Sequence, residues 1–197
     1  MGPSRHSTAQ WQALDRNHFL HPFTDLTRLH AGASRIITRG EGVYLWDSDD
    51  NRLLDGFAGL WCVNMGYGRA ELAAAAAAQM QELPYYNSFF NTATPPALEL
   101  AELLAEVSPP QFNYSFFTGS GSEANEKAYK IVRQIAHNKY GGKKHKILYR
   151  NRDYHGTTIT ALSSGGQDER KGQYGPFTPG FVEVPHCLEY RSQWGEV

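Results

Sequence analysis

The chain has 197 residues, of which 41% are hydrophobic and 20% charged, and its formal net charge is -1 at pH 7. This composition is typical of a folded protein, and the charge gives no general attraction to nucleic acid or to a membrane surface. With only two cysteines, no apolar run long enough to span a bilayer and no signal-peptide core in residues 1–20, the sequence predicts a cytoplasmic protein.

The first segments predict a helix followed by short strands. A helix is expected over residues 9–18, and Pro22 ends it. Short strands are expected at residues 36–37 and 43–46, with the acidic residues 47–51 as the following turn. This turn lacks the glycine and the terminal glutamate of a calcium loop, so we interpret it as a hairpin tip without a metal.

Residues 54–68 are dense in glycine and in apolar side chains. A loop in solvent would not carry Phe57, Leu60, Trp61 and Val63 together, so this segment is expected to lie against the core or a pocket. Taken alone, the tryptophan is most simply a buried side chain whose indole N–H is satisfied.

Two helices are expected in the middle of the chain. The alanine-rich residues 71–83 predict a tightly packed helix that Pro84 ends. An aromatic loop at residues 85–91 follows and contains Phe89, for which ordinary core packing is one interpretation. Thr94 stands before two prolines and marks the start of the second helix.

A glycine-serine turn then separates a strand-like run from a helix-like run. The aromatic residues 112–117 enter the turn, and apolar residues at helical spacing leave it. In this geometry, backbone N–H groups and the helix dipole converge on an anion, and the hydroxyls of Ser120 and Ser122 add donors beside Gly121. A capped turn without a ligand is the alternative. Neither the nucleotide P-loop nor the dinucleotide fingerprint matches the spacing.

The last segments predict two further strands. Residues 146–150 form the first, and Tyr154 and His155 follow it in a loop before a helix of small residues. Open α/β folds bind ligands at the carboxyl ends of parallel strands, which places Tyr154 at such an edge. Residues 166–180 are loop-like, and residues 181–185 predict the next strand.

Three of these segments resemble the class III, or ω-transaminase, group of pyridoxal-phosphate aminotransferases. They are Gly-Ser-Gly-Ser-Glu-Ala-Asn at residues 119–125, the glycine-rich residues 54–68, and Tyr154-His155-Gly156. In that family the first segment holds the cofactor phosphate, and an aromatic residue before His-Gly stacks on the pyridine ring. The resemblance therefore assigns pyridoxal 5'-phosphate to Ser120, Gly121, Ser122, Tyr154 and His155, with His155 supporting the loop.

The resemblance also implies a substrate pocket. The family's tryptophan lines that pocket, which implies the same role for Trp61, with Leu60, Phe23 and Tyr154 beside it. Phe89 is expected near the interface of a homodimer, reaching the pocket of the neighbouring subunit.

The implied fold is α/β of fold type I, the aspartate-aminotransferase type, present only in part. Residues 1–66 are expected to be the N-terminal segment of the small domain, and residues 67–197 the start of the large domain that binds pyridoxal phosphate. No lysine of this chain matches the family's Schiff-base lysine, which is expected beyond residue 197. We therefore expect an N-terminal fragment without a catalytic residue of its own, inactive alone.

The implied activity moves an amino group from an amine or ω-amino acid to an α-keto acid, with pyruvate as the expected acceptor. Small amines and keto acids are then the partners. Two alternatives stay open: a non-catalytic module for cofactor binding or assembly, and another fold-type I enzyme such as a racemase or decarboxylase.

Overall fold

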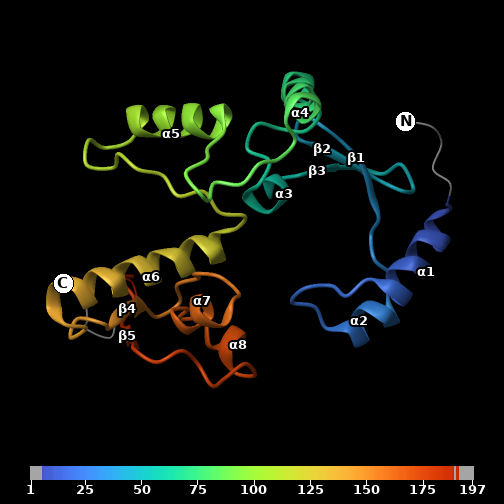
Figure 1. Cartoon of the computed structure of the whole chain (residues 1–197). Coiled ribbons are helices and arrows are strands. Elements are labelled where there is room, and N and C mark those ends of the chain that lie inside the picture. The colour runs from blue at the N-terminus through green and yellow to red at the C-terminus, as the bar shows by residue number, and fades with distance from the viewer. Residues whose placement is uncertain (1–5, 189, 191–197) are drawn as a thin grey trace. The chain divides into compact units, whose positions relative to one another are not determined.

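A computed structural model describes residues 6–188 and residue 190 (Figure 1). Contacts between residues divide the chain into two compact units, Met1–Thr92 and Ala93–Val197. The expected domain boundary between residues 66 and 67 stays a prediction. Within the described part of the chain, each helix is too short or too polar to cross a bilayer.

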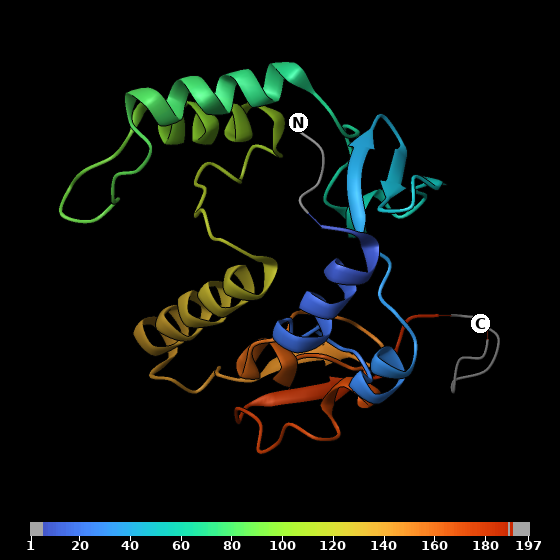
Figure 2. The same ribbon diagram turned by 90° about the vertical axis from the view of Figure 1, so that its right-hand side faces the viewer.

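The first unit is built around a small antiparallel sheet. Its elements are α1 (Thr8–His18), α2 (Leu26–Ala31), β1 (Ile37–Glu41), β2 (Tyr44–Asp47), β3 (Arg52–Leu54), α3 (Ala58–Trp61) and α4 (Ala70–Glu82). The strands pair in the order β1-β2-β3 and lie side by side in Figures 1 and 2. The predicted first helix is confirmed to within one residue, and a capping box between Ser7 and Gln10 closes its start.

The acidic turn between β2 and β3 is confirmed as a hairpin tip. The buried Asp47 carboxylate accepts hydrogen bonds from the backbone N–H groups of Asp49 and Asn51, each at 3.0 Å. Burial disfavours its charge, but hydrogen bonds from Asn51 and Asp49 outweigh that effect and hold the pKa of Asp47 below its usual value. The Asp47 carboxylate therefore stabilises the turn itself, and the Asp49 carboxylate accepts from the Thr8 hydroxyl of α1 at 2.6 Å.

The expected tight packing of the alanine-rich α4 is wrong, since no residue of this helix is buried. Leu60 and Trp61 are 57% and 74% exposed, so they do not lie in the core of this unit, and their place at a pocket stays a prediction. The pattern of apolar residues shows which face of a segment can be buried. It does not show that a covering element lies on that face within the same unit.

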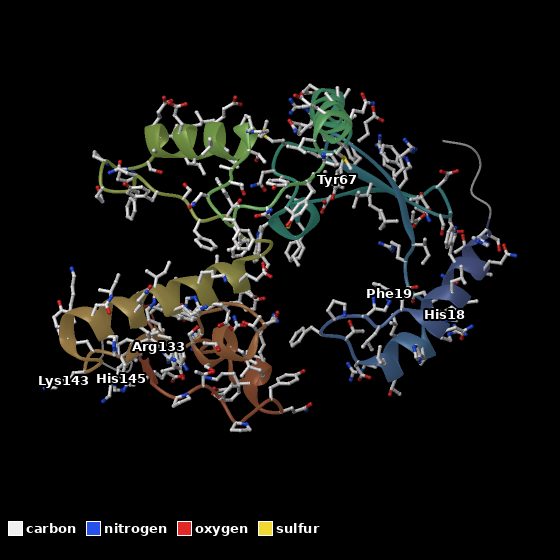
Figure 3. All side chains as sticks on the ribbon, viewed as in Figure 1. His18, Phe19, Tyr67, Arg133, Lys143 and His145 are labelled. Carbon is white, nitrogen blue, oxygen red and sulfur yellow. The ribbon has the colours of Figure 1, made fainter. Side chains whose placement is uncertain are left out.

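The second unit combines helices with a pair of parallel strands. Its elements are α5 (Pro95–Val107), α6 (Gly121–Tyr140), β4 (Ile147–Arg150), α7 (Ile159–Ser163), α8 (Asp168–Lys171) and β5 (Phe181–Val184). Strands β4 and β5 pair in parallel, as expected of residues 146–150 and 181–185. Helix α6 packs on β5, since the rings of Tyr129 and Phe181 are 5.1 Å apart. Arg133, labelled in Figure 3, donates to the Pro179 carbonyl oxygen at 2.9 Å.

The strand expected at residues 112–117 is not one in the structure. These residues pair with no described strand, and Tyr114 is fully exposed. Aromatic residues favour extended backbone, but a strand exists only where a neighbouring strand accepts its hydrogen bonds. The short helix α8 lies in the segment expected to be a loop.

Candidate active site

The glycine-serine turn begins α6 at the expected place. Ser120 is the N-cap, and its hydroxyl accepts a hydrogen bond from the backbone N–H of Glu123 at 3.2 Å. The Glu123 carboxylate accepts from the N–H of Gly119 at 2.8 Å. The predicted capping interaction is therefore present, and it engages the N–H groups of Glu123 and Gly119 at this helix start.

Other donors at the start of α6 remain available. Among the described residues, the N–H groups of Gly121 and Ser122 have no hydrogen-bond partner. A Cβ added at Gly121 would meet no atom within 4 Å, so the space beside it is open. The Ser122 hydroxyl oxygen accepts from the N–H of Thr157 at 3.0 Å, which leaves its hydrogen free to donate. This donor set fits a phosphate at the N-terminus of a 20-residue helix.

The loop that carries Tyr154 meets the same end of α6. It follows β4, so Tyr154 lies beyond the carboxyl end of a parallel strand, as the sequence predicts. The side chain is 53% exposed, and the Arg170 guanidinium carbon lies 5.3 Å from the centre of its ring. The turn and the loop, far apart in sequence, are thus neighbours in this unit.

Side chains of α6 hold the residues that follow Tyr154. The Asn125 amide donates to the carbonyl oxygen of His155 at 2.6 Å, and Thr158 donates to the Glu126 carboxylate at 2.6 Å. Gly156 is buried with φ +130°, and a Cβ there would lie 2.4 Å from the Ser122 hydroxyl oxygen. Only glycine allows this close approach between loop and helix.

The imidazole of His155 points to a charged pair formed by the last residue of β4 and a residue of the same loop. Its Nε2 lies 3.7 Å from the Asp153 carboxylate, which also accepts from Arg150 Nε at 2.9 Å. The hydrogen bond to Asp153 and its charge raise the pKa of Arg150. His155 thus contacts its own loop through its side chain and α6 through its carbonyl group, which agrees with a supporting role.

Trp61 and Leu60, expected in the substrate pocket, belong to an unusual turn in the first unit. The φ angles of Ala58, Gly59, Leu60 and Trp61 are +46°, +58°, +63° and +64°. Left-handed backbone costs about 1–2 kcal/mol for each residue other than glycine. Strain of this kind is concentrated at functional sites. Leu60 and Trp61, which the family resemblance assigns to the substrate pocket, are therefore among the strained residues of this chain.

The Asp55 carboxylate holds this turn. Its Oδ2 accepts from the Gly59 N–H at 2.8 Å and from the Tyr67 hydroxyl at 2.7 Å, and its Oδ1 accepts from the Phe57 N–H at 3.1 Å. The hydrogen bond from Tyr67, followed by that from Gly59, lowers the pKa of Asp55. The same hydrogen bond raises the pKa of Tyr67. Both groups are thereby kept in the forms that bond to each other.

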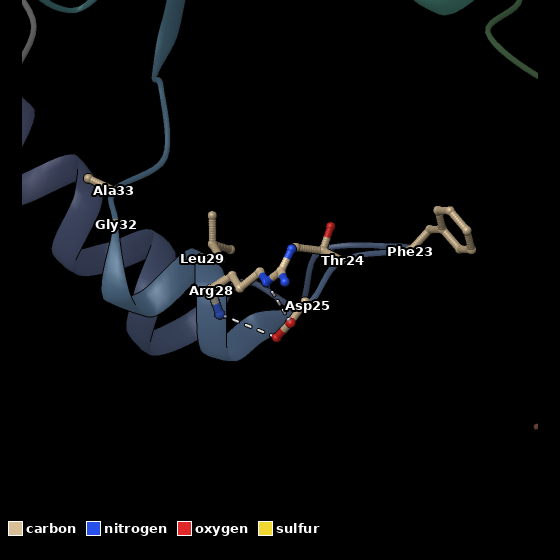
Figure 4. A pocket seen from close by; sticks show the side chains of 7 residues that line it. All are labelled: Phe23, Thr24, Asp25, Arg28, Leu29, Gly32 and Ala33. Carbon is tan, nitrogen blue, oxygen red and sulfur yellow. Dashed lines mark hydrogen bonds and ion pairs between the residues drawn. The ribbon is translucent and has the colours of Figure 1, made fainter.

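Phe23 and Phe89 lie elsewhere in the first unit. Phe23 borders an open hollow of about 450 Å³ formed with α2, in which Arg28 pairs with Asp25 (Figure 4). Neither Trp61 nor Phe89 lines this hollow. The Phe89 side chain is 73% exposed, with its ring centre 6.1 Å from that of Phe90. The expected places of Phe23 in the substrate pocket and of Phe89 at the pocket of a neighbouring subunit stay predictions.

Three residues with clear contacts in these sites have no role in the sequence prediction: Asp55, Tyr67 and Asn125. Asp55 offered a signal, because an aspartate directly after a strand and before a glycine often accepts hydrogen bonds from the next N–H groups. Tyr67 and Asn125 offered none, since their partners are distant in sequence.

Comparison with known proteins finds relatives over most of the chain. The model of the family Aminotransferase class-III matches residues 28–196. Putrescine–pyruvate aminotransferase of Pseudomonas aeruginosa is 50% identical over 93% of this chain and 40% of its own length. Taurine–pyruvate aminotransferase of Rhodobacter capsulatus is 48% identical over 92% of this chain and 39% of its own length. The chain thus spans about 40% of these relatives.

Solved structures agree with this placement. An (S)-enantioselective ω-transaminase from Thermomicrobium roseum superposes with a TM-score of 0.95 at 41% identity, covering 98% of this chain and 43% of its own. The ω-transaminase of Pseudomonas jessenii in complex with PMP gives 0.89 at 33% identity, covering 92% and 40%. The fold is therefore the corresponding part of a fold-type I enzyme. This chain belongs to the class-III aminotransferase family, whose members use pyridoxal phosphate.

Proposed function

We propose that this chain supplies the phosphate site, the ring contact and part of the substrate pocket of an aminotransferase. The reaction moves an amino group from an amine or ω-amino acid to an α-keto acid, and pyruvate is the acceptor. Relatives named for putrescine, taurine and pyruvate support this choice. The observation that carries it is the start of α6, where free N–H groups lie beside the Tyr154 loop.

Pyridoxal phosphate, when bound, supplies the electron sink and the carrier for the amino group. In this proposal the N–H groups of Gly121 and Ser122 and the Ser122 hydroxyl bind its phosphate, and the dipole of α6 favours the negative charge. Ser120, the N-cap, is proposed to donate to the phosphate as well, because its hydroxyl oxygen accepts from the Glu123 N–H and its hydrogen is free to donate. The exposed ring of Tyr154 offers a face for stacking, and His155 keeps its loop on α6 through Asn125.

The amine is proposed to bind against Trp61 and Leu60, with Phe23 and Tyr154 as further walls. Phe89 is proposed to reach the pocket of a second subunit in a homodimer. Support for Trp61 comes from the strained turn that presents it. A thermostable ω-transaminase variant in which glycine replaces a tryptophan was engineered for the asymmetric synthesis of enantiopure bulky amines, which supports control of amine size by a tryptophan.

The lysine that holds the cofactor and the carboxylate for the pyridine nitrogen are proposed to lie beyond these 197 residues. The greater length of the relatives supports this assignment. The chain alone is then proposed to be inactive. A domain boundary near residue 66 and a cytoplasmic location are part of the same proposal.

The test is cofactor retention by the whole aminotransferase that contains this chain. In Gly121→Asp, a carboxylate occupies the open space before α6 and repels the phosphate, so the purified protein should retain less than a tenth of the wild-type pyridoxal phosphate. Gly172→Asp is the control, because its φ is ordinary and its Cβ would have normal contacts. Absorbance after desalting measures the cofactor, and full occupancy in Gly121→Asp would refute the phosphate site.

A further inference from the structure

The turn that carries Trp61 has backbone hydrogen bonds of its own, from the Trp61 N–H to the Phe57 carbonyl oxygen and from the Cys62 N–H to that of Ala58, each at 2.9 Å, and it has further contacts outside itself. Its backbone is left-handed over four residues, three of which have side chains that disfavour that region. A backbone in this state persists only when its surroundings over-determine it. The contacts that do so identify the residues on which the position of Trp61 depends.

Asp55 supplies these contacts from the end of β3. One carboxylate accepts the N–H groups of Phe57 and Gly59 and the hydroxyl of Tyr67, at 2.7–3.1 Å. Its own N–H donates to the carbonyl oxygen of Val43 at 2.9 Å, which ties it to the sheet. Asp55 therefore connects the sheet to the strained turn.

Tyr67 holds the carboxylate from the other side. Its backbone exchanges two hydrogen bonds with Gly42, at 2.8 and 3.1 Å, in the turn between β1 and β2. Its ring lies so close to Gly40 that a Cβ there would be 2.7 Å from the ring carbon Cγ. Its hydroxyl also lies against the turn, 3.0 Å from a Cβ added at Gly59. Tyr67 (labelled in Figure 3) is thus fixed on the sheet, and its hydroxyl orients Asp55.

We propose that Asp55 and Tyr67 are positioning residues that set the place of the Trp61 ring and thereby the size of amine the enzyme accepts. The inference rests on the proposed function, because it takes Trp61 as a wall of the amine pocket. The carboxylate is the essential part, since only an acceptor with two oxygens receives all three donors. An amide in its place presents an NH₂ group to one side and loses at least one of them.

The experiment uses the whole aminotransferase and has two arms. The first arm omits substrate and measures hydrogen exchange of the peptide covering residues 55–62 in wild type, Asp55→Asn and Tyr67→Phe. Exchange should be at least three-fold faster in both variants, because the N–H groups of Phe57 and Gly59 lose their acceptor or its orientation. Asp50→Asn is the control, since Asp50 is exposed at the hairpin tip.

The second arm measures kcat/KM for a small and a bulky amine. Asp55→Asn should move the ratio of the two in the same direction as Trp61→Ala, by roughly three-fold or more. In the double variant that combines Asp55→Asn with Trp61→Ala, the ratio of the two kcat/KM values should equal that of Trp61→Ala alone. If Asp55 had a purely structural role, Asp55→Asn would lower kcat/KM for both amines by the same factor. Its effect would then add to that of Trp61→Ala in the double variant.

Each outcome decides the inference. Faster exchange with a non-additive change of amine preference supports it. Unchanged exchange overturns it, as does an additive or equal effect on both amines. If Trp61→Ala itself leaves the preference unchanged, the pocket assignment has failed and the inference falls with it. The exchange arm would still show separately whether Asp55 holds the turn.

Discussion

Two aromatic side chains are proposed to face the ligands, and the molecule holds them in opposite ways. Trp61 lies on a strained left-handed turn in which one carboxylate, that of Asp55, accepts from the Gly59 N–H, while the Trp61 N–H donates to the Phe57 carbonyl oxygen. Tyr154 lies on a loop that several side chains of α6 hold, among them Ser122 and Asn125. Asp55 is a concentrated anchor, a single side chain at the Trp61 turn. The side chains of α6 are a distributed anchor, since several of them hold the Tyr154 loop.

The difference follows from the elements that carry the anchors. A helix presents side chains at spacings of three and four on one face, so Ser122, Asn125 and Glu126 reach the same loop together. A strand end presents a single side chain to the turn after it. Removing one contact should therefore disturb the Trp61 turn more than the Tyr154 loop, except where helix and loop touch most closely.

The largest effect is expected at that point of closest contact. In Gly156→Ala the new methyl group would collide with Ser122, including its Cα at 2.9 Å, and φ +130° would be strained. We expect a loss of about 2–4 kcal/mol in unfolding free energy and at least a ten-fold weaker affinity for pyridoxal phosphate. Urea unfolding and a fluorescence titration measure these. Gly172→Ala is the control. If Gly156→Ala bound pyridoxal phosphate with wild-type affinity, the close contact between Gly156 and Ser122 would not be needed for cofactor binding.

The second prediction concerns the loss of the stabilising hydrogen bonds of Asp55 at low pH. The pKa of Asp55 is lowered from 3.8, so its stabilising hydrogen bonds are complete above that value and are lost as the pH falls through the lower folded value. The difference in urea stability between wild type and Asp55→Asn should be constant from pH 7 to about 5 and shrink below about 4. A difference that already declines near pH 6 would assign the effect to another group.

A smaller effect is expected for a single member of the distributed anchor. Asn125→Ala removes the donor to His155 and should cost about 1 kcal/mol of stability and several-fold in cofactor affinity. Asn138→Ala, at an exposed position of the same helix, is the matched control. If Asn125→Ala abolishes cofactor binding, the Tyr154 loop has a concentrated anchor after all, and the contrast with Trp61 disappears.

The smallest effect is expected for Glu126→Ala. The hydrogen bond that Thr158 donates to this carboxylate is exposed, so water replaces it readily. Stability should change by less than about 0.5 kcal/mol and cofactor affinity by less than two-fold. A larger loss than in Asn125→Ala would reverse the order of importance on this face of α6.

The sequence by itself determined the local elements and the family. The glycine-serine turn marks the start of α6, the acidic residues 47–51 mark a hairpin tip, and residues 146–150 and 181–185 mark two strands, all confirmed. These features depend on neighbours within a few residues, where capping, turn chemistry and periodicity act. The same motifs identified the class-III aminotransferases, which the family model confirms.

Only the tertiary structure decided which residues hold the two aromatic side chains. Tyr67 meets Asp55 from twelve positions away, and Asn125 meets His155 from thirty, so no local pattern pairs them. The left-handed turn at Trp61 could not be predicted from the sequence either, because the local backbone preference of these residues disfavours it. Residues 112–117 show the converse, since strand-like residues remain unpaired among the described strands. Hydrogen bonds between distant segments override local preference, and that is why these features appear only in the folded chain.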